Sequence, residues 1–430
     1  MKSNRVLLVS IITIIILLAA SILISVTYDS YRFYNGLAGS LAMSPDDEEI
    51  AFSYYENGDM EMYTSNREGN HIEQVSHSPD GDVTNPEFSP DGEELLYLSA
   101  SSQRVSSIFI QDRGTKKTEQ ITGEDIHIED AVFSPDSEMI YYIGIAAEDW
   151  QAEDGEAAGG FDLFAYDRES ETTKQLSKQN YYIMDNLSVD PNNSFLLYSS
   201  FEEDTEEVMS FSLNDDPDIS TEMERFTGEV YNPTLSPDGE ALAYSVMVDN
   251  SVGNDSYEYE LFLFDTDSGN RQRLTNTNTN VEAPVFFHED DRMLFLKDRD
   301  WPEDPVNYSL HSINLDNRET ERISINGLEE QGTPLFYASA AAFSNRYVAI
   351  SLYSLLGILL TIVWNYRQKT YRPAVTSFVL SSLLFLSSLF SPLFDPWGML
   401  GLGNLAGSLA VCSLIILAFA YILKRFRPAP

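Results

Sequence analysis

The chain has 430 residues, of which 68 are acidic and 26 basic, so its formal net charge is −42. Residues 29–333 hold 67 of the acidic and 17 of the basic residues, whereas the flanking segments hold one Asp against nine Lys or Arg. A body with a formal charge of −50 repels nucleic acid and anionic lipid surfaces. Nucleic-acid binding is therefore excluded.

The chain begins with an apolar segment, residues 6–26, which follows Lys2 and Arg5 and contains no charged residue. Its 21 residues are enough to cross the hydrocarbon core of a bilayer. A cleavable signal peptide is the competing interpretation, because the start is basic. However, the apolar run is long and no small-x-small cleavage site follows it. We predict that residues 1–28 form an uncleaved transmembrane anchor.

A turn motif of the type Ser-Pro-Asp-Gly, followed by an apolar strand, recurs through residues 29–333. Its copies begin at Ser44, Ser89, Ser134, Asp190 and Ser236, with a degraded sixth copy near Phe287. The spacing of 45 to 56 residues is typical of the blades of a β-propeller. Proline, Asp and Gly each favour the tight turn by their backbone preferences, so the motif predicts a turn and not a reactive site.

Each repeat also contains an unbroken apolar third strand, which is typical of strands buried on both faces. A closing strand recurs six times, at residues 74–76, 120–122, 175–177, 225–227, 273–275 and 322–324. These patterns predict an all-β propeller of six four-stranded antiparallel blades. The first repeat begins at about Leu37 and the last ends at about Ser324, so no strand exchange is needed to close the ring.

The repeat Pro-x-Phe-Ser-Pro-Asp-Gly … Leu-x-Tyr … Leu-Phe-x-x-Asp … Gln-Leu-Thr resembles the TolB-like β-propeller repeat. That repeat is also found in the propellers of prolyl-oligopeptidase-type enzymes. The resemblance covers about residues 37–325 and implies a propeller that binds proteins, peptides or sugars, gates a hydrolase, or carries lyase chemistry. The chain differs from TolB in lacking a separate N-terminal domain and in having membrane segments, so a Tol-system role does not carry over.

Catalytic signatures do not accompany the repeats. The sequence contains no Gly-x-Ser-x-Gly elbow, and no room for a hydrolase domain remains after Ser324. The five histidines are scattered through the repeats and match no metal or triad spacing. A lyase of this fold would need clustered His and Arg at the centre of the ring, and the sequence does not show that cluster. We expect no enzymatic activity.

Long acidic insertions between second and third strands are the candidate binding elements, because loops commonly carry binding. In a propeller they share one face with the loops that join the blades. The candidate partner-binding residues are Asp149, Trp150, Glu153, Asp154, Glu202, Asp204, Asp249, Asp255, Asp298 and Trp301. A solvated acidic surface without a ligand is the alternative, and the low lysine content fits either a halophilic source or an ordinary acidic secreted domain.

A calcium site is the one metal site that the pattern suggests. Asp80 and Asp82 flank a glycine, yet the segment falls short of a full calcium loop. The single cysteine, Cys412, lies in an apolar segment, which excludes disulfides and thiolate metal sites. No other cofactor is predicted.

Three further apolar segments, residues 347–364, 373–393 and 399–423, predict three C-terminal transmembrane helices within a region that spans residues 334–430. Lysine and arginine residues lie in the loop 367–372 and after the last apolar segment, whereas the loop 394–398 contains no basic residue. The positive-inside rule places both termini in the cytoplasm and the propeller, residues 29–333, outside. The spans contain no ionisable residue, which argues against a pump or a proton-coupled transporter.

Together these patterns predict a multi-pass membrane protein whose propeller is a non-catalytic binding module for an envelope or extracellular protein or glycan. Two alternatives stay open. One is a propeller lyase or hydrolase that acts on a polymer at an axial site. The other is an accessory subunit of a membrane complex, in which the spans make the main contacts. Small residues in the spans, Ser377, Ser381, Ser388, Gly403 and Gly407, are suited to close helix packing.

Overall fold

The computed structural model describes residues 2–78, 81–153, 156–202, 205–214, 220–222, 230–248, 258–298, 301–302, 304–328, 334–391 and 398–426. The chain divides into two compact units. One is Tyr31–Gly332, and the other joins Met1–Ser30 to Thr333–Pro430. The first consists of strands with one short helix, and the second contains the remaining helices.

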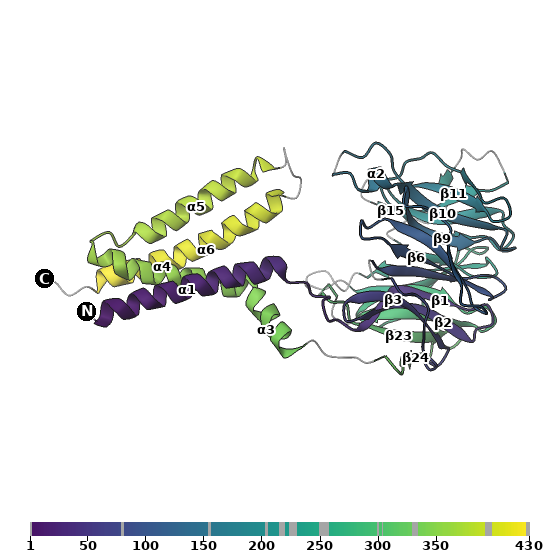
Figure 1. The fold of residues 1–430 in the computed structure, drawn as a ribbon, viewed down its shortest axis with the longest axis horizontal. Helices are drawn as coiled ribbons and strands as arrows, with labels where there is room; N and C mark the ends of the chain where they lie inside the picture. The colour runs from purple at the N-terminus through teal and green to yellow at the C-terminus, as the bar shows by residue number, and fades with distance from the viewer. Residues whose placement is uncertain are drawn as a thin grey trace. The chain divides into compact units, whose positions relative to one another are not determined.

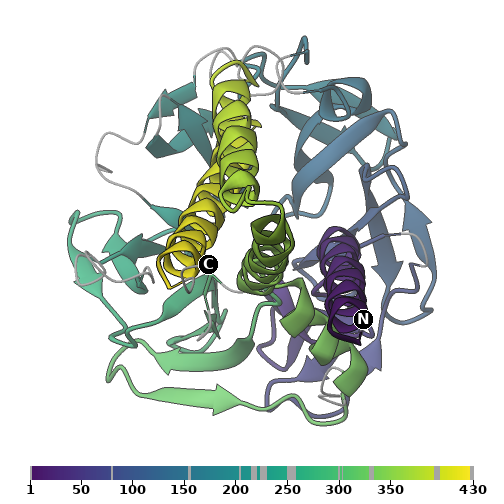
Figure 2. The ribbon, with the colours of Figure 1, turned by 90° about the vertical axis from the view of Figure 1, so that its left-hand side faces the viewer.

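Six four-stranded antiparallel sheets form the unit Tyr31–Gly332, arranged around a central axis (Figure 2). The first three blades are β1 (Gly36–Met43), β2 (Glu49–Glu56), β3 (Asp59–Asn66), β4 (Glu73–Gln74); β5 (Val83–Phe88), β6 (Glu94–Ala100), β7 (Ser106–Asp112), β8 (Thr118–Gln120); and β9 (Ile126–Phe133), β10 (Met139–Ala146), β11 (Asp162–Asp167), β12 (Thr172–Gln175). The last three are β13 (Met184–Val189), β14 (Phe195–Glu202), β15 (Thr205–Ser212), β16 (Ser220–Glu222); β17 (Tyr231–Leu235), β18 (Ala241–Met247), β19 (Tyr259–Asp265), β20 (Arg271–Arg273); and β21 (Asn280–Phe286), β22 (Arg292–Asp298), β23 (Tyr308–Asn314), β24 (Thr320–Ile323).

Every sheet takes its strands in chain order from one continuous stretch, so the predicted six-bladed propeller without strand exchange is confirmed. The short helix α2 (Ala147–Trp150) follows β10. In blade 4 the closing strand is β16, and the predicted closing segment at residues 225–227 lies outside the described residues.

The Ser-Pro-Asp-Gly turns have the geometry that their residues favour. The hydroxyls of Ser44, Ser89 and Ser134 each donate to the Asp carboxylate two residues later, at 2.6 Å. This bond holds the pKa of that carboxyl below its ordinary value. The fourth turn residue has a positive φ whether it is glycine, as at Gly92 (71°), or another residue, as at Ser137 (60°).

A second recurring contact joins the third and closing strands within a blade. The Ser177 hydroxyl accepts from the Leu163 amide at 2.9 Å and donates to buried Asp162 at 2.8 Å. Thr275 makes the same pair of bonds, to the Leu261 amide at 2.9 Å and to fully buried Glu260 at 2.5 Å. The Ser or Thr that ends the repeat therefore satisfies a buried amide and a buried carboxylate together.

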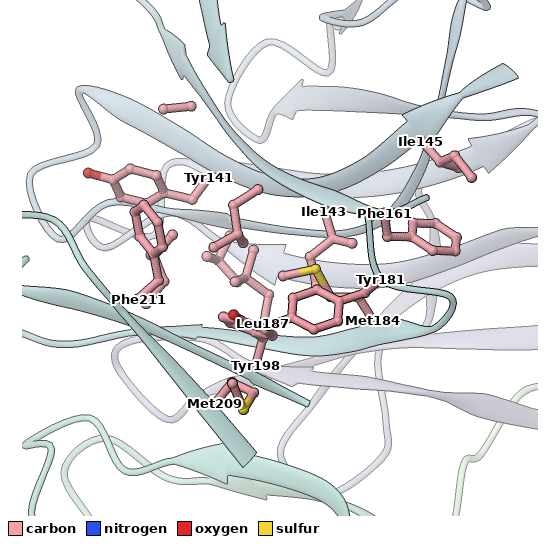
Figure 3. Packing of buried hydrophobic residues seen from close by; sticks show 14 residues of the cluster. Tyr141, Ile143, Ile145, Phe161, Tyr181, Met184, Leu187, Tyr198, Met209 and Phe211 are labelled. Carbon is pink, nitrogen blue, oxygen red and sulfur yellow. The ribbon is translucent and has the colours of Figure 1, made fainter. Parts of the chain in front are cut away.

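The hydrophobic core lies between neighbouring blades. Figure 3 shows one cluster, in which Ile143 and Phe161 of blade 3 pack with Met184, Leu187 and Phe211 of blade 4. Burial of a large apolar side chain contributes about 1.5–3 kcal/mol. Because each sheet is covered on both faces in this way, its middle strands are apolar on both sides, as the unbroken runs predicted.

The ring closes between blades 6 and 1 through apolar and polar contacts. Leu37 and Phe52 of blade 1 pack in one cluster with Leu294 of blade 6. The Asp47 carboxylate, 2 % exposed, accepts hydrogen bonds from the backbone amides of three consecutive blade 6 residues, His288, Glu289 and Asp290, at 2.7, 2.8 and 3.0 Å. Asp47 stands at the glycine position of its own turn, with φ 57°, and it holds the degraded turn of the sixth blade.

The helical unit consists of α1 (Lys2–Thr27), α3 (Leu335–Ser344), α4 (Arg346–Tyr366), α5 (Arg372–Ser388) and α6 (Gly398–Arg425). Among the described residues of this unit, three helical segments are long and apolar enough to cross a membrane: Arg5–Thr27, Arg346–Tyr366 and Met399–Arg425. Helix α5 has 17 residues and is shorter than the predicted span at 373–393, part of which lies outside the described residues. The sequence did not predict α3.

Helices α4, α5 and α6 pack through small residues. Ser381 donates to the Ala406 carbonyl at 2.8 Å, and Ser377 and Ser413 bond at 2.8 Å. A Cβ atom at Gly357 would lie 2.2 Å from Ile416 Cδ1, so glycine there permits the close approach of α4 and α6. A Cβ atom added at Gly403 or Gly407 would meet no described atom within 4 Å, so the predicted close packing at these two glycines is not seen in the described chain. The N-terminal end of α1, the α4–α5 connection and the C-terminal end of α6 lie at one end of the unit (Figure 1).

Candidate functional site

A cavity of about 360 Å³ lies on the axis of the propeller. Residues from the first strands and the following turns of all six blades line it. The turn residues that share this lining are Pro45, Pro90, Pro135, Pro191, Pro237 and His288. The turns therefore surround one mouth of the cavity, and His288 stands where the other five blades have proline.

Two successive positions near the end of each first strand line this cavity, and the first of the two contains an ionisable residue in one blade. This first position lies two residues before the turn motif and is occupied by Ala42, Glu87, Val132, Ser188, Thr234 and Val285. Glu87 is the ionisable member of this set. A carboxylate thus projects from β5 into a cavity whose other walls are largely proline and aliphatic side chains.

The Glu87 carboxyl group is poorly solvated. Within the part of the chain that the structure describes, no hydrogen bond or ion pair reaches it. Burial raises its pKa to about 8, and the nearby Asp130 carboxylate adds to the increase. The side chain is still partly open to the cavity, so a ligand can reach it from there.

Asp130 on β9 belongs to a hydrogen-bonded group on the first strands. Its carboxylate accepts from the Leu187 amide at 2.7 Å, the Ala131 amide at 2.9 Å and the Asn85 side chain at 3.2 Å. These bonds favour the charged form, but burial outweighs them and raises the pKa of Asp130 to about 7. Asn85 lies in a β-bulge with φ 49°. The group links blades 2, 3 and 4 around the axis.

Where the structure describes them, the partner-binding residues that were predicted in the loops do not line the axial cavity. Asp149 and Trp150 lie together in α2, and the Asp149 carboxylate accepts from the Ala158 amide at 2.7 Å. The Trp150 ring stacks on His127 at 3.9 Å and its indole donates to the Arg104 carbonyl at 2.8 Å. Trp150 is therefore fixed against blades 2 and 3, although 40 % of it stays exposed.

The other predicted loop residues do not form one described cluster. Glu153 is exposed, Glu202 ends β14 opposite Thr205, and Asp298 at the end of β22 is only 1 % exposed. Trp301 is 38 % exposed. Four further predictions lie outside the described residues: Asp154, Asp204, Asp249 and Asp255.

The predicted calcium site is only partly described. Asp82 is exposed, and Asp80 lies outside the described residues. Among the residues that the structure describes, no group of three or more His, Cys, Asp or Glu side chains could hold a metal ion. The clustered ligands that an axial metal site would require are therefore not found in this part of the chain.

The two candidate surfaces lie on opposite faces of the ring. In antiparallel blades, the loops between second and third strands lie on the face where the chain enters at β1 and leaves at β24. The Ser-Pro-Asp-Gly turns and the axial mouth lie on the other face. The sequence analysis did not single out Glu87. An alignment of the six repeats could have indicated it, because Glu87 is the one acidic residue at the position two residues before the Ser-Pro-Asp-Gly turn.

Comparison with known proteins identifies the type of propeller. Residues 28–216 match the family model described as the TolB beta propeller domain. The repeats within these residues are similar to those of that family. TolB from Acinetobacter baumannii is 17 % identical with a TM-score of 0.51, and the match covers 68 % of this chain and 64 % of that TolB. The chain thus matches slightly less than two thirds of that protein's length.

Other solved structures are similar at lower scores. An oligogalacturonate lyase in complex with manganese is 15 % identical with a TM-score of 0.48, and the match covers 68 % of this chain and 77 % of the lyase. The oligogalacturonate lyase from Vibrio parahaemolyticus is 12 % identical with a TM-score of 0.47, covering 67 % and 78 %. At these identities the similarity concerns the fold alone. No curated protein matches the chain significantly.

Proposed function

We propose that this TolB-like propeller is a recognition module anchored in a membrane. Helices α1, α4, α5 and α6 cross the bilayer with both termini in the cytoplasm, and the propeller lies outside. The ends of the helices that carry Lys2, Arg5, Lys424 and Arg425 lie together with the basic α4–α5 connection (Figure 1). An excess of basic residues at one end of the spans is what the positive-inside rule requires of four consecutive spans.

The propeller binds an envelope or extracellular protein through the axial cavity, and the unpartnered Glu87 carboxyl group is the observation that carries this proposal. A cavity of about 360 Å³ accommodates a side chain or a chain terminus of a partner. Its proline and aliphatic walls favour the apolar stem of a long side chain, while Glu87 favours a cationic end group. The partner group is therefore a lysine side chain or an α-amino group.

The raised pKa of Glu87 makes this recognition dependent on pH. At neutral pH the carboxyl group is largely protonated, because its pKa lies at about 8. A bound ammonium group stabilises the carboxylate and lowers that pKa, so binding releases a proton. The affinity for a cation should consequently rise as the pH increases from about 6 to 8.

A pair of small ligands tests the axial site. N-acetyl-lysine amide is added to the purified full chain in detergent, and N-acetyl-norleucine amide serves as the uncharged analogue. Only the lysine derivative should raise the thermal midpoint, and Glu87→Gln should abolish the effect. Glu138→Gln, which changes an exposed acid beside a turn on the same face, should preserve it. Equal effects of both ligands, or an unchanged effect in Glu87→Gln, would refute the site.

Cysteine labelling in intact cells tests the orientation. Cys412 is buried, so a Cys412→Ala chain is a suitable background for single cysteines. Asp316→Cys lies in an exposed turn of the propeller and should react with a membrane-impermeant maleimide. Gln368→Cys lies in the α4–α5 connection and should react only after lysis. The reverse pattern would show that the propeller is cytoplasmic.

A further inference from the structure

A second cavity, of about 960 Å³, lies within the helical unit between α4, α5 and α6. Its apolar part is lined by Leu360, Val375 and Ile416. Its polar part, at the end with the α4–α5 connection, is lined by Lys369, Arg372 and Lys424. The cavity is thus amphipathic, with three cationic side chains at one end and aliphatic walls along the helices.

Within the described part of the chain, the three cations have no acidic partner. Among the described residues of the helical unit, the one acidic residue is Asp29, which follows the opposite end of α1 and bonds to Tyr337 through its backbone. None of the ion pairs between described residues involves Lys369, Arg372 or Lys424. A cluster of three bases beside apolar walls strongly attracts an anion.

Aromatic rings hold the cations at the mouth of the cavity. The Arg372 guanidinium lies over Trp364 at 4.9 Å, and the Lys424 ammonium lies over Tyr371 at 5.0 Å. The buried Thr370 hydroxyl bonds to the Asn365 side chain at 2.9 Å and thereby fixes the connection between α4 and α5. These contacts restrict the side chains before a ligand arrives, which reduces the ordering cost of binding.

We propose that this cavity binds one anionic phospholipid of the cytoplasmic leaflet. The phosphate bonds to Lys369, Arg372 and Lys424, and an acyl chain lies along Leu360, Val375 and Ile416. Guanidinium and ammonium groups are strong donors to phosphate oxygens, and basic cavities between spans on this side of a membrane suit anionic headgroups. The aliphatic walls distinguish a lipid from a free phosphate ion. The inference rests on the proposed membrane insertion of the helices.

Quenching of Trp364 fluorescence measures the binding. The full chain, with Trp397→Phe, is reconstituted into phosphatidylcholine nanodiscs that contain increasing fractions of either brominated phosphatidylglycerol or brominated phosphatidylcholine. Trp364 should be half quenched at a much lower fraction of the phosphatidylglycerol. Lys369→Gln, Arg372→Gln and Lys424→Gln should each reduce this preference about five-fold, since one base near an anionic surface contributes about 1 kcal/mol.

Two variants act as controls. Arg346→Gln removes a base that also stacks on a neighbouring ring, Tyr347 at 5.0 Å, but at the other end of α4, so the preference should persist. Lys424→Arg keeps the charge and should retain most of the preference. If Lys424→Arg loses it as fully as Lys424→Gln, the effect is structural and the proposal is overturned.

The remaining outcomes distinguish a failure of the proposed lipid site from a failure of the proposed membrane insertion. A chain that enters nanodiscs but shows equal quenching by both lipids refutes the lipid site and leaves the membrane placement intact. A chain that does not enter nanodiscs refutes both. Loss of the preference on addition of millimolar glycerol phosphate would show that the site binds a soluble phosphate group and would overturn the assignment to a lipid.

Discussion

Replacing Glu87 by glutamine should stabilise the folded chain at alkaline pH and leave its stability nearly unchanged at pH 5. The ordinary pKa of a glutamic acid is 4.5, and in the folded chain the pKa of Glu87 is raised to about 8. Between these values the folded state holds a proton that the unfolded state releases. The stability of the wild type therefore falls as the pH rises from about 4.5 to 8. Glutamine does not ionise and escapes this loss.

The magnitude follows from the size of the shift. Each unit of pKa difference corresponds to about 1.36 kcal/mol, so the full increase at Glu87 sets an upper limit of about 4–5 kcal/mol above pH 8. The side chain is partly open to the axial cavity, and solvent there reduces the penalty. We expect Glu87→Gln to gain about 1–3 kcal/mol at pH 8.5, which is an increase in the thermal midpoint of a few degrees.

Calorimetric or fluorescence melting of the full chain in detergent at pH 5 and pH 8.5 measures the difference. Glu260→Gln is the matched control, because that buried carboxylate accepts from Thr275, the Thr277 amide and the Asn278 amide. Its substitution should destabilise the propeller at both pH values. If Glu87→Gln lowers the midpoint at pH 8.5, or raises it equally at pH 5, the Glu87 carboxyl group is not the poorly solvated acid that the axial site requires.

Three other substitutions test the contacts that hold the ring. Asp47→Gly should cost about 2–4 kcal/mol, because three consecutive amides of blade 6 lose their buried, charged acceptor, whereas Ser137→Gly, at the same turn position with φ 60°, should be neutral or slightly stabilising. Thr275→Val should cost about 1–3 kcal/mol, because the buried Leu261 amide loses its acceptor and the buried Glu260 carboxylate loses one of its donors; a loss below 0.5 kcal/mol would contradict this role. Arg168→Ala should cost about 1–2 kcal/mol, because its guanidinium bonds to both Glu94 oxygens of the preceding blade at 2.8 and 2.7 Å, and in a Glu94→Gln background that cost should shrink. Chemical denaturation of the full chain measures all three.

Much of the fold could be predicted because its signals are local. A Ser-Pro-Asp-Gly turn depends on the backbone preferences of four neighbouring residues, and the copies from Ser44 to Ser236 all form the turn that was predicted. The apolar runs near both ends of the chain depend only on hydropathy and length. The helix α3 was missed because ten residues adjoining a longer apolar run carry no separate signal.

The candidate binding residues were harder to predict. Trp150 was predicted as a partner-binding residue from its position in an acidic insertion, but the sequence did not indicate that its ring stacks on His127, 23 positions earlier, while 40 % of it stays exposed. Asp298 was expected on an acidic surface, but the end of β22 is buried. Length and charge of an insertion indicate that a loop exists. They do not indicate how the loop folds back on the blades.

The amino-acid sequence was sufficient for the number of blades, the closure without strand exchange and the position of three long apolar helices, since each depends on residues close together in the chain. Only the tertiary structure placed Glu87 at the axis and gathered Lys369, Arg372 and Lys424 around one cavity. These groupings depend on which side chains from separate strands or helices face a common space. Ring closure and helix packing determine that arrangement, and no local pattern encodes it.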